Sequence, residues 1–206
     1  MSDTPMCEIP IDVYRRLRLL YLIEQFDVAC FGSVRLHKTA YFSEKEQQVR
    51  VFTFRKARHG QYSEDLENTL EQLLTMDLVV AEPMESSQGK GNKYHAVKEG
   101  SVPCPHAQWL AAISADAKNA IEQAVQTYGY KKLPELLETA HTQDGFEDAA
   151  GFDVLLQANA PEYIPVSLSQ EACDDLILAL SPGFVMTLLD LSQAVKEFDF
   201  RRVRSD

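Results

Sequence analysis

Residues 54–80, FRKARHGQYSEDLENTLEQLLTMDLVV, decide the fold, because they predict one amphipathic helix between a turn and a strand. Ser63 is a residue type that caps helix N-termini, and Glu64 and Asp65 follow it in the first turn, where the helix dipole favours acids. The apolar positions recur at helical spacing, at Leu66, Leu70, Leu73 and Leu74. The other side of the helix carries Glu67, Asn68, Glu71 and Gln72. We therefore expect a helix that packs its leucines against a core and turns an acidic face outward.

The segments on both sides of this helix predict a characteristic order of elements. They are helices at 11–26 and 34–42, a strand at 49–54, the central helix, a strand at 78–83, a Gly- and Ser-rich loop at 84–92 and a strand at 93–97. Ser33 is expected to cap the second helix. The first helix carries Arg15, Arg16 and Arg18, which we expect on a solvated side rather than in an anion site. This order is that of a winged helix, with 84–92 as the wing.

The second half of the chain is more helical and more irregular. A proline-bounded linker at 101–106 precedes helices at 107–113, 115–128 and 133–141. Residues 143–166 predict an irregular connection with one apolar island at 154–156, and a strand-like YIPVSLS follows at 163–169. Two helices close the chain, one capped by Ser167 or Ser169 and one starting after Ser181, before a basic tail. We expect an α+β, mainly helical fold: a winged-helix-like module with trailing helices at 1–142 and an acidic helical extension at 143–206, which packs on the module or binds a partner.

The composition is that of an ordinary soluble protein. The 206 residues are 45% hydrophobic and 25% charged, which allows one sizeable core, or one domain plus an extension. The longest apolar runs, at 19–23 and 176–180, are far too short to cross a bilayer, and the N-terminal MSDTPMCEIP lacks the regions of a signal peptide. We therefore expect a cytoplasmic protein without a membrane partner.

Neither the cysteines nor the histidines show metal-binding spacing. The cysteines are Cys7, Cys30, Cys104 and Cys173, and the histidines are His37, His59, His95, His106 and His141. Without paired spacing, a disulfide framework or a zinc site is not indicated, and we expect free, mostly buried thiols. We also expect no metal and no cofactor.

The negative charge is concentrated in the second half. Residues 1–100 carry a net charge of −2 and residues 101–206 a net charge of −9, which together give the −11 of the chain. An acidic surface repels a nucleic-acid backbone, so this distribution favours a protein partner, in particular a basic one.

Basic residues nevertheless gather in the turn before the central helix and in the wing. His59 could meet an anion beside a helix N-terminus, although a turn residue that hydrogen-bonds the backbone is the favoured alternative. The wing segment GKGNK lacks the spacing and the strand-to-helix context of a P-loop. The predicted partner- or anion-binding residues are Arg55, Lys56, Arg58, His59, Lys90 and Lys93.

No catalytic motif is present. GxSxG is absent, and the adjacent Asp174 and Asp175 point in different directions on a helix. We expect no enzyme activity; an unrecognised site around His59 is the remaining enzymatic alternative. Base reading by the central helix is also disfavoured, because it offers acids and no Lys or Arg where phosphates require cations. DNA contact would then involve the wing.

Three segments resemble a known series of domains. RLHKTAYF, HGQYSEDLENTLEQLLTMDLV and YGYKKLPELLETAH are similar to the motifs of Panacea (SocA-like) domains and the related YwgA-like phage-associated proteins, over residues 11–141. The matching positions are Lys38, Tyr41, Phe42, Gly60, Tyr62, Ser63, Leu66, Leu70, Leu73, Leu78, Tyr128, Gly129 and Leu136. Gln61 stands where that family commonly has proline, and Asp77 where it often has glycine.

The resemblance implies a winged-helix-like module used mainly for protein contacts. Such domains act as antitoxins, as proteolytic adaptors or as components of mobile-element and phage-defence loci. The expected partner is then a toxin, a protease or a defence-complex subunit. The alternative is a winged-helix transcriptional regulator that contacts DNA through the wing.

Overall fold

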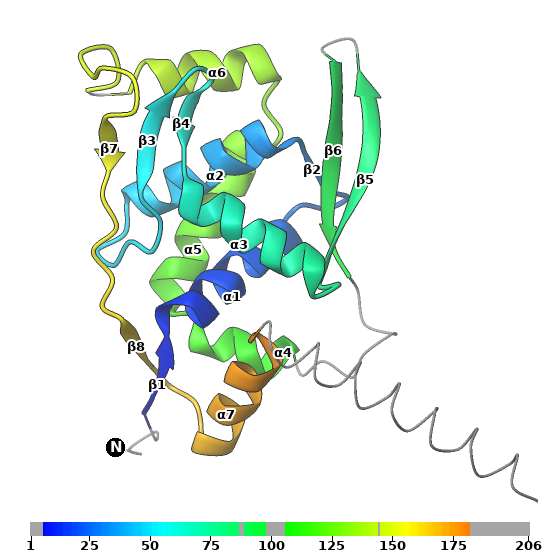
Figure 1. Cartoon of the computed structure of the whole chain (residues 1–206), viewed down its shortest axis with the longest axis vertical. Helices are drawn as coiled ribbons and strands as arrows, with labels where there is room; N and C mark the ends of the chain where they lie inside the picture. Colours follow the sequence, from blue (N-terminus) through cyan, green and yellow to red (C-terminus); the bar gives the residue numbers. More distant parts are fainter. Residues whose placement is uncertain (1–5, 87–88, 98–105, 144, 182–206) are drawn as a thin grey trace, which may run out of the picture.

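The computed structural model describes residues 6–86, 89–97, 106–143 and 145–181, which form an α+β fold (Figure 1). Its helices are α1 (Ile11–Glu24), α2 (Ser33–Lys45), α3 (Glu64–Thr75), α4 (His106–Trp109) with the 3-10 turn η1 (Leu110–Ala112), α5 (Ala115–Ala124) with the π turn η2 (Val125–Gly129), α6 (Leu133–His141) and α7 (Gln170–Ala179). Its strands are β1 (Cys7–Pro10), β2 (Cys30–Phe31), β3 (Phe54–Ala57), β4 (Gly60–Tyr62), β5 (Val79–Ser86), β6 (Gly89–Ala96), β7 (Val154–Leu156) and β8 (Tyr163–Val166). The described strands form three antiparallel sheets, ordered β1-β8, β2-β6-β5 and β4-β3-β7.

The prediction for the central helix is confirmed. The Ser63 hydroxyl accepts a hydrogen bond from the Leu66 amide at 3.2 Å, which caps α3. Leu66, Leu70 and Leu73 are buried, and α3 packs against α1 in the middle of the molecule (Figure 1). The helices predicted at 11–26, 115–128 and 133–141 also form, and Ser169 caps α7. Ser33, in contrast, lies inside α2, whose N-cap is Gly32.

The prediction of a solvated arginine side on α1 is wrong, because α1 is buried on nearly all sides. The Arg18 guanidinium forms an ion pair with Glu44 at 2.9 Å, and both side chains are almost fully buried. Arg16 donates to the Gln72 side chain at 2.5 Å. These arginines are therefore internal connections between α1, α2 and α3.

The strand predicted at 49–54 is also wrong, since pairing starts only at Phe54. Residues 54–62 form a hairpin instead of a simple turn: β3 pairs with β4, and Arg58 and His59 make the two-residue turn between them. The predicted flexible wing is largely strand as well. β5 and β6 pair continuously from Val79↔Ala96 to Ser86↔Gly89, with Pro83 inside β5.

The second half returns to the first through strand pairs and one disulfide. The apolar island at 154–156 is β7, which pairs with β3, and β8 pairs with β1. Cys7 of β1 is bonded to Cys173 of α7, so the prediction of free thiols is wrong for this pair; Cys30 is free and buried. Cys104, most of the predicted linker, the last helix and the basic tail lie outside the described residues. In the part that is described, no helix is long and apolar enough to span a membrane.

Candidate functional site

The β5–β6 hairpin has one packed and one open face. Val79, Tyr94 and Ala96 are buried and face the helical core. Because side chains alternate along a strand, the neighbouring residues Val80 and His95, which pair with each other, face the other way. The outer face of this hairpin is therefore the part of the sheet that remains open to another molecule.

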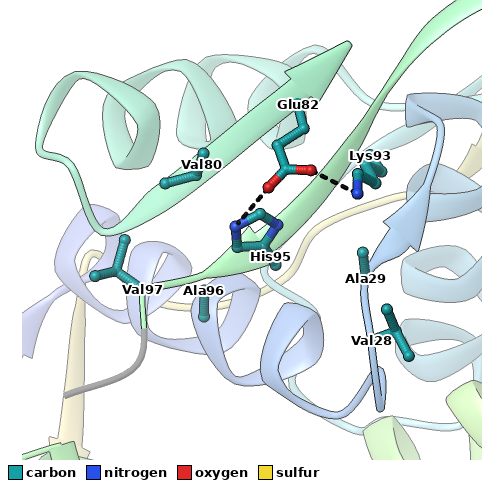
Figure 2. A pocket seen from close by; sticks show the side chains of 8 residues that line it. All are labelled: Val28, Ala29, Val80, Glu82, Lys93, His95, Ala96 and Val97. Carbon is teal, nitrogen blue, oxygen red and sulfur yellow. Dashed lines mark ion pairs between the residues drawn. The ribbon is translucent and has the colours of Figure 1, made fainter. Parts of the chain in front are cut away.

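A hollow of about 430 Å³ lies on this outer face. Figure 2 shows it between the hairpin and the segment that leads into β2. Its lining consists of Val28, Ala29, Val80, Glu82, Lys93, His95, Ala96 and Val97. Val28 is 74% exposed and Val80 39% exposed, so two aliphatic side chains are presented to solvent here. A single exposed valine is ordinary, whereas here two of them line one hollow, and Figure 2 shows Glu82, His95 and Lys93 between them.

The hollow exists because β2 is short. β2 pairs with β6 only at Cys30↔Tyr94 and Phe31↔Lys93. The preceding residues Val28 and Ala29 line the hollow without belonging to this ladder. The space between residues 28–29 and the C-terminal end of β6 is therefore closed neither by strand pairing nor by packed side chains.

One carboxylate organises the polar side chains of the hollow, which lie between Val80 and Val28 (Figure 2). Glu82 lies 2.5 Å from Lys93 Nζ and 3.6 Å from His95 Nε2 (Figure 2). The hydrogen bond from Lys93 lowers the pKa of Glu82, so this carboxylate is ionised at neutral pH. Exposed ion pairs of this kind contribute little stability. Glu82 is therefore free to share its charge with a partner's cation at little cost.

The structure divides the basic residues that the sequence groups together. Lys93 lies in the hollow and pairs with Glu82, and Lys90 pairs with Glu85 at 3.1 Å on the exposed hairpin. His59 does not lie at the start of α3, where the Ser63 amide donates to His37 Nδ1 instead. His59 and Lys90 instead line one separate cavity, next to the start of α2.

The two basic residues of β3 donate hydrogen bonds to the loop at residues 146–152 in the second half of the chain. Lys56 Nζ donates to the carbonyls of Phe146 and Ala149 at 2.5 and 2.7 Å and lies 4.6 Å from the centre of the Phe146 ring. Arg55 donates to the carbonyl of Phe152 at 3.3 Å. These cations are engaged within the chain. Arg58, in the β3–β4 turn, is the neighbour of His59.

A buried basic cluster that the sequence did not predict lies under the β3–β4 hairpin. Lys38 is 2% exposed, and its ammonium donates to the Gln61 carbonyl at 2.6 Å. Burial lowers the pKa of Lys38 to about 7. Gln61 Oε1 and His141 Nε2 are shielded from solvent and have no hydrogen-bond partner among the described residues. Burial and the charges of Lys38 and Lys56 lower the pKa of His141, which favours its neutral form.

His37 joins α2 to α3 in a neutral form. Its Nδ1 accepts the Ser63 amide at 3.1 Å, which places the ring proton on Nε2, 2.9 Å from the Glu67 carboxylate. Its ring stacks on Tyr62 with 4.7 Å between ring centres. Burial lowers the pKa of His37 and so favours the neutral ring, in which the Ser63 amide fixes the tautomer. We interpret His37 as a structural residue.

Within the described residues, no group of three or more His, Cys, Asp or Glu side chains is arranged to hold a metal ion. No family model, curated protein or solved structure matches this chain. The geometry of the hollow and of the basic residues is thus the basis for any functional conclusion.

Proposed function

We propose that this chain is a non-enzymatic protein-interaction module, antitoxin-like or adaptor-like, from a mobile-element or phage-defence locus. The observation that supports it best is the outer-face hollow, where the exposed Val28 and Val80 lie beside the Glu82 carboxylate. Protein interfaces combine an apolar contact with a polar rim, and a few anchoring side chains provide most of the affinity. The hollow has both components, an apolar contact and a polar group.

The partner that fits this surface is a protein segment with an aliphatic side chain next to a basic one. The aliphatic side chain would contact Val80, the basic one would share Glu82 with Lys93, and Val28 would border the same contact. The net charge of −11 favours the approach of such a partner, because complementary charge accelerates encounter. A toxin, a protease or a defence-complex subunit with this segment is the expected class.

The winged-helix assignment and the Panacea or YwgA-like relationship are part of this proposal. The order α1, β2, α2, α3, β5, β6 supports a winged-helix core, with the β3–β4 hairpin inserted between α2 and α3. α3 carries no Lys or Arg, and two of its acids are engaged internally: Asp65 with Arg15 and Glu67 with His37. An acidic helix of this kind suits protein contact better than the major groove of DNA.

Replacing Val80 with lysine tests the proposal, because it puts a charge at an apolar position in the lining of the hollow. The tagged chain would be purified from its native host as wild type, as Val80→Lys and as Val154→Lys. Val154 is a matched control, since it is a strand valine with similar exposure, 42% against 39%. We expect a stoichiometric partner with the wild type and with Val154→Lys, and about tenfold less with Val80→Lys. Equal recovery with all three proteins, or a wild type without any partner, would contradict the proposal.

DNA contact through the wing is the second candidate. The basic side chains of the hairpin favour it, but Lys90 and Lys93 each already have a glutamate partner. A phosphate would have to compete with Glu85 and Glu82, so we expect weak binding that is lost at physiological salt. A mobility shift of duplex DNA that persists at that salt and disappears in Lys90→Glu plus Lys93→Glu would promote this candidate over the first.

A further inference from the structure

A second cavity lies on the other side of the hairpin from the outer-face hollow. It has a volume of about 550 Å³ and lies between the distal part of the β5–β6 hairpin, the start of α2 and the β3–β4 turn. Its lining includes Phe31, Arg35, His59, Lys90 and Asn92. Three separate segments therefore contribute one basic side chain each. Ligand cavities for small molecules have volumes in the same range, roughly 300–1,000 Å³.

The charged side chains that line this cavity are basic. Among the described residues of the lining there is no Asp or Glu, although Glu85 pairs with Lys90 beside it. Arg35 donates to two backbone carbonyls, of Gly129 at 2.8 Å and of Lys131 at 2.7 Å, which hold the guanidinium in place without neutralising it. Arg35 is thus a cation held in place at the wall of the cavity, and no ion pair of Arg35 is formed within the described residues.

The other two basic side chains are available to a ligand. Lys90 pairs with Glu85, and both side chains are highly exposed, so that this ion pair is weak and exchangeable. His59 lies in the two-residue turn between β3 and β4 and lines the same cavity. The Phe31 ring is 45% exposed at the same cavity and offers an apolar surface. The combination is an anion site with room for an organic group.

We infer that this cavity binds a small phosphate-bearing ligand, with the phosphate held by Arg35, His59 and Lys90 and the organic part against Phe31. Arginine and lysine are the side chains that proteins use most for phosphate, through charge-assisted hydrogen bonds. A lone phosphate would leave most of the volume empty, which is why the ligand is larger than the inorganic ion. This site is independent of the proposed protein contact, which uses the outer face of the hairpin.

Calorimetric titration with ADP and with pyrophosphate tests this inference, because it compares a pair of substitutions in the cavity with a pair on the outer face of the β5–β6 hairpin. The double variant His59→Gln plus Lys90→Gln removes two basic groups from the cavity. The matched control, His95→Gln plus Lys93→Gln, removes the same residue types from the outer face. We expect saturable binding of both ligands by the wild type and the control, and binding about tenfold weaker or worse in the cavity variant. The Phe31→Ala variant should weaken ADP binding but not pyrophosphate binding.

Three results would overturn the inference: no binding by the wild type, equal weakening in both double variants, or binding that sulfate at equal concentration abolishes. Equal weakening would show attraction by general surface charge rather than by a site. The Val80→Lys variant should bind ADP like the wild type. A wild-type chain that recovers its partner but does not bind ADP would reject the cavity alone. A wild-type chain that binds ADP but recovers no partner would reject the protein contact alone.

Discussion

Lys38 is the residue whose environment departs most from the ordinary. Its side chain is buried and donates to a neutral carbonyl, and no ion pair involving it is formed within the described residues. Gly60 makes this burial possible: at a φ of 94°, its backbone comes so close that a Cβ there would stand 2.9 Å from Lys38 Nζ. The neighbourhood of Lys38 is thus closely packed, which suits a structural or titrating role better than a ligand site.

Titration of Lys38 should make the stability of the protein depend on pH in a specific window. Its pKa falls from 10.5 to about 7 on folding, so between these values the unfolded chain binds the proton and the folded chain does not. The free energy of unfolding therefore rises with pH in this window, and Lys38→Met removes that rise. Between about pH 6.5 and pH 10 we expect the wild type to gain about 3–4 kcal/mol relative to Lys38→Met.

Urea denaturation of both proteins at the two pH values measures this difference. Lys132→Met is the control, because Lys132 is exposed and its substitution should shift the curve equally at both pH values. Parallel pH profiles for the wild type and Lys38→Met would show that Lys38 keeps its ordinary pKa in the folded protein. The sequence did not reveal this site, because a lysine on a helix is exposed by default and its burial here depends on a hairpin 22 residues later.

At the scale of elements, local sequence signals were sufficient to predict α3 but not to predict the structure of residues 49–53. Ser63 and the leucine spacing act within α3 itself, so the sequence predicted it correctly. The residue types at 49–53 alternate as in a strand, yet their backbone amides donate to side chains of other segments. Val51 donates to Glu44, Thr53 to Asp65 and Arg50 to Asn159. Bonds to distant side chains replace a strand ladder here, and no local pattern predicts them.

Glu44 should be the strongest of these connections. Its carboxylate pairs with the buried Arg18 and accepts the Val51 amide at 2.7 Å, so it joins α1, α2 and the following segment. Glu44→Gln keeps the size and shape but leaves the Arg18 charge buried without a counter-charge. We expect a loss of about 3–5 kcal/mol in the free energy of unfolding, measured by urea denaturation. Glu46→Gln, at an exposed position on the C-cap of α2, should change it by less than about 0.5 kcal/mol. Similar values for both variants would contradict this assignment.

At the scale of the whole molecule, long-range pairs determine how the second half is placed. β7 and β8 return to β3 and β1, and the Cys7–Cys173 disulfide joins residues 166 positions apart. Spacing could not predict this bond, because the β1–β8 pair is what brings the two cysteines together. Reducing compartments seldom retain such a bond, so the cytoplasmic location stays a prediction.

The candidate site was predictable only in part for the same reason. The sequence indicated basic residues at 90–93 and in the turn before the central helix, and the β5–β6 hairpin does carry Lys90 and Lys93. It did not indicate that glutamates pair with both lysines, or that Val28 and Val80 line one hollow, because these arrangements depend on how the strands and the segment before β2 lie in three dimensions. The outer-face hollow follows from how β2 and the hairpin lie together in three dimensions.

Hydrogen exchange on the complex with the partner recovered from the native host tests the proposed protein contact most directly. Binding across the outer-face hollow would cover the backbone at 28–30 and 93–97 and slow exchange of its amides, while α3 would exchange as in the free chain. That pattern is the predicted result. Protection confined to α3, with unchanged exchange around Val28 and His95, would contradict the claim that the outer face of this hairpin is the docking surface.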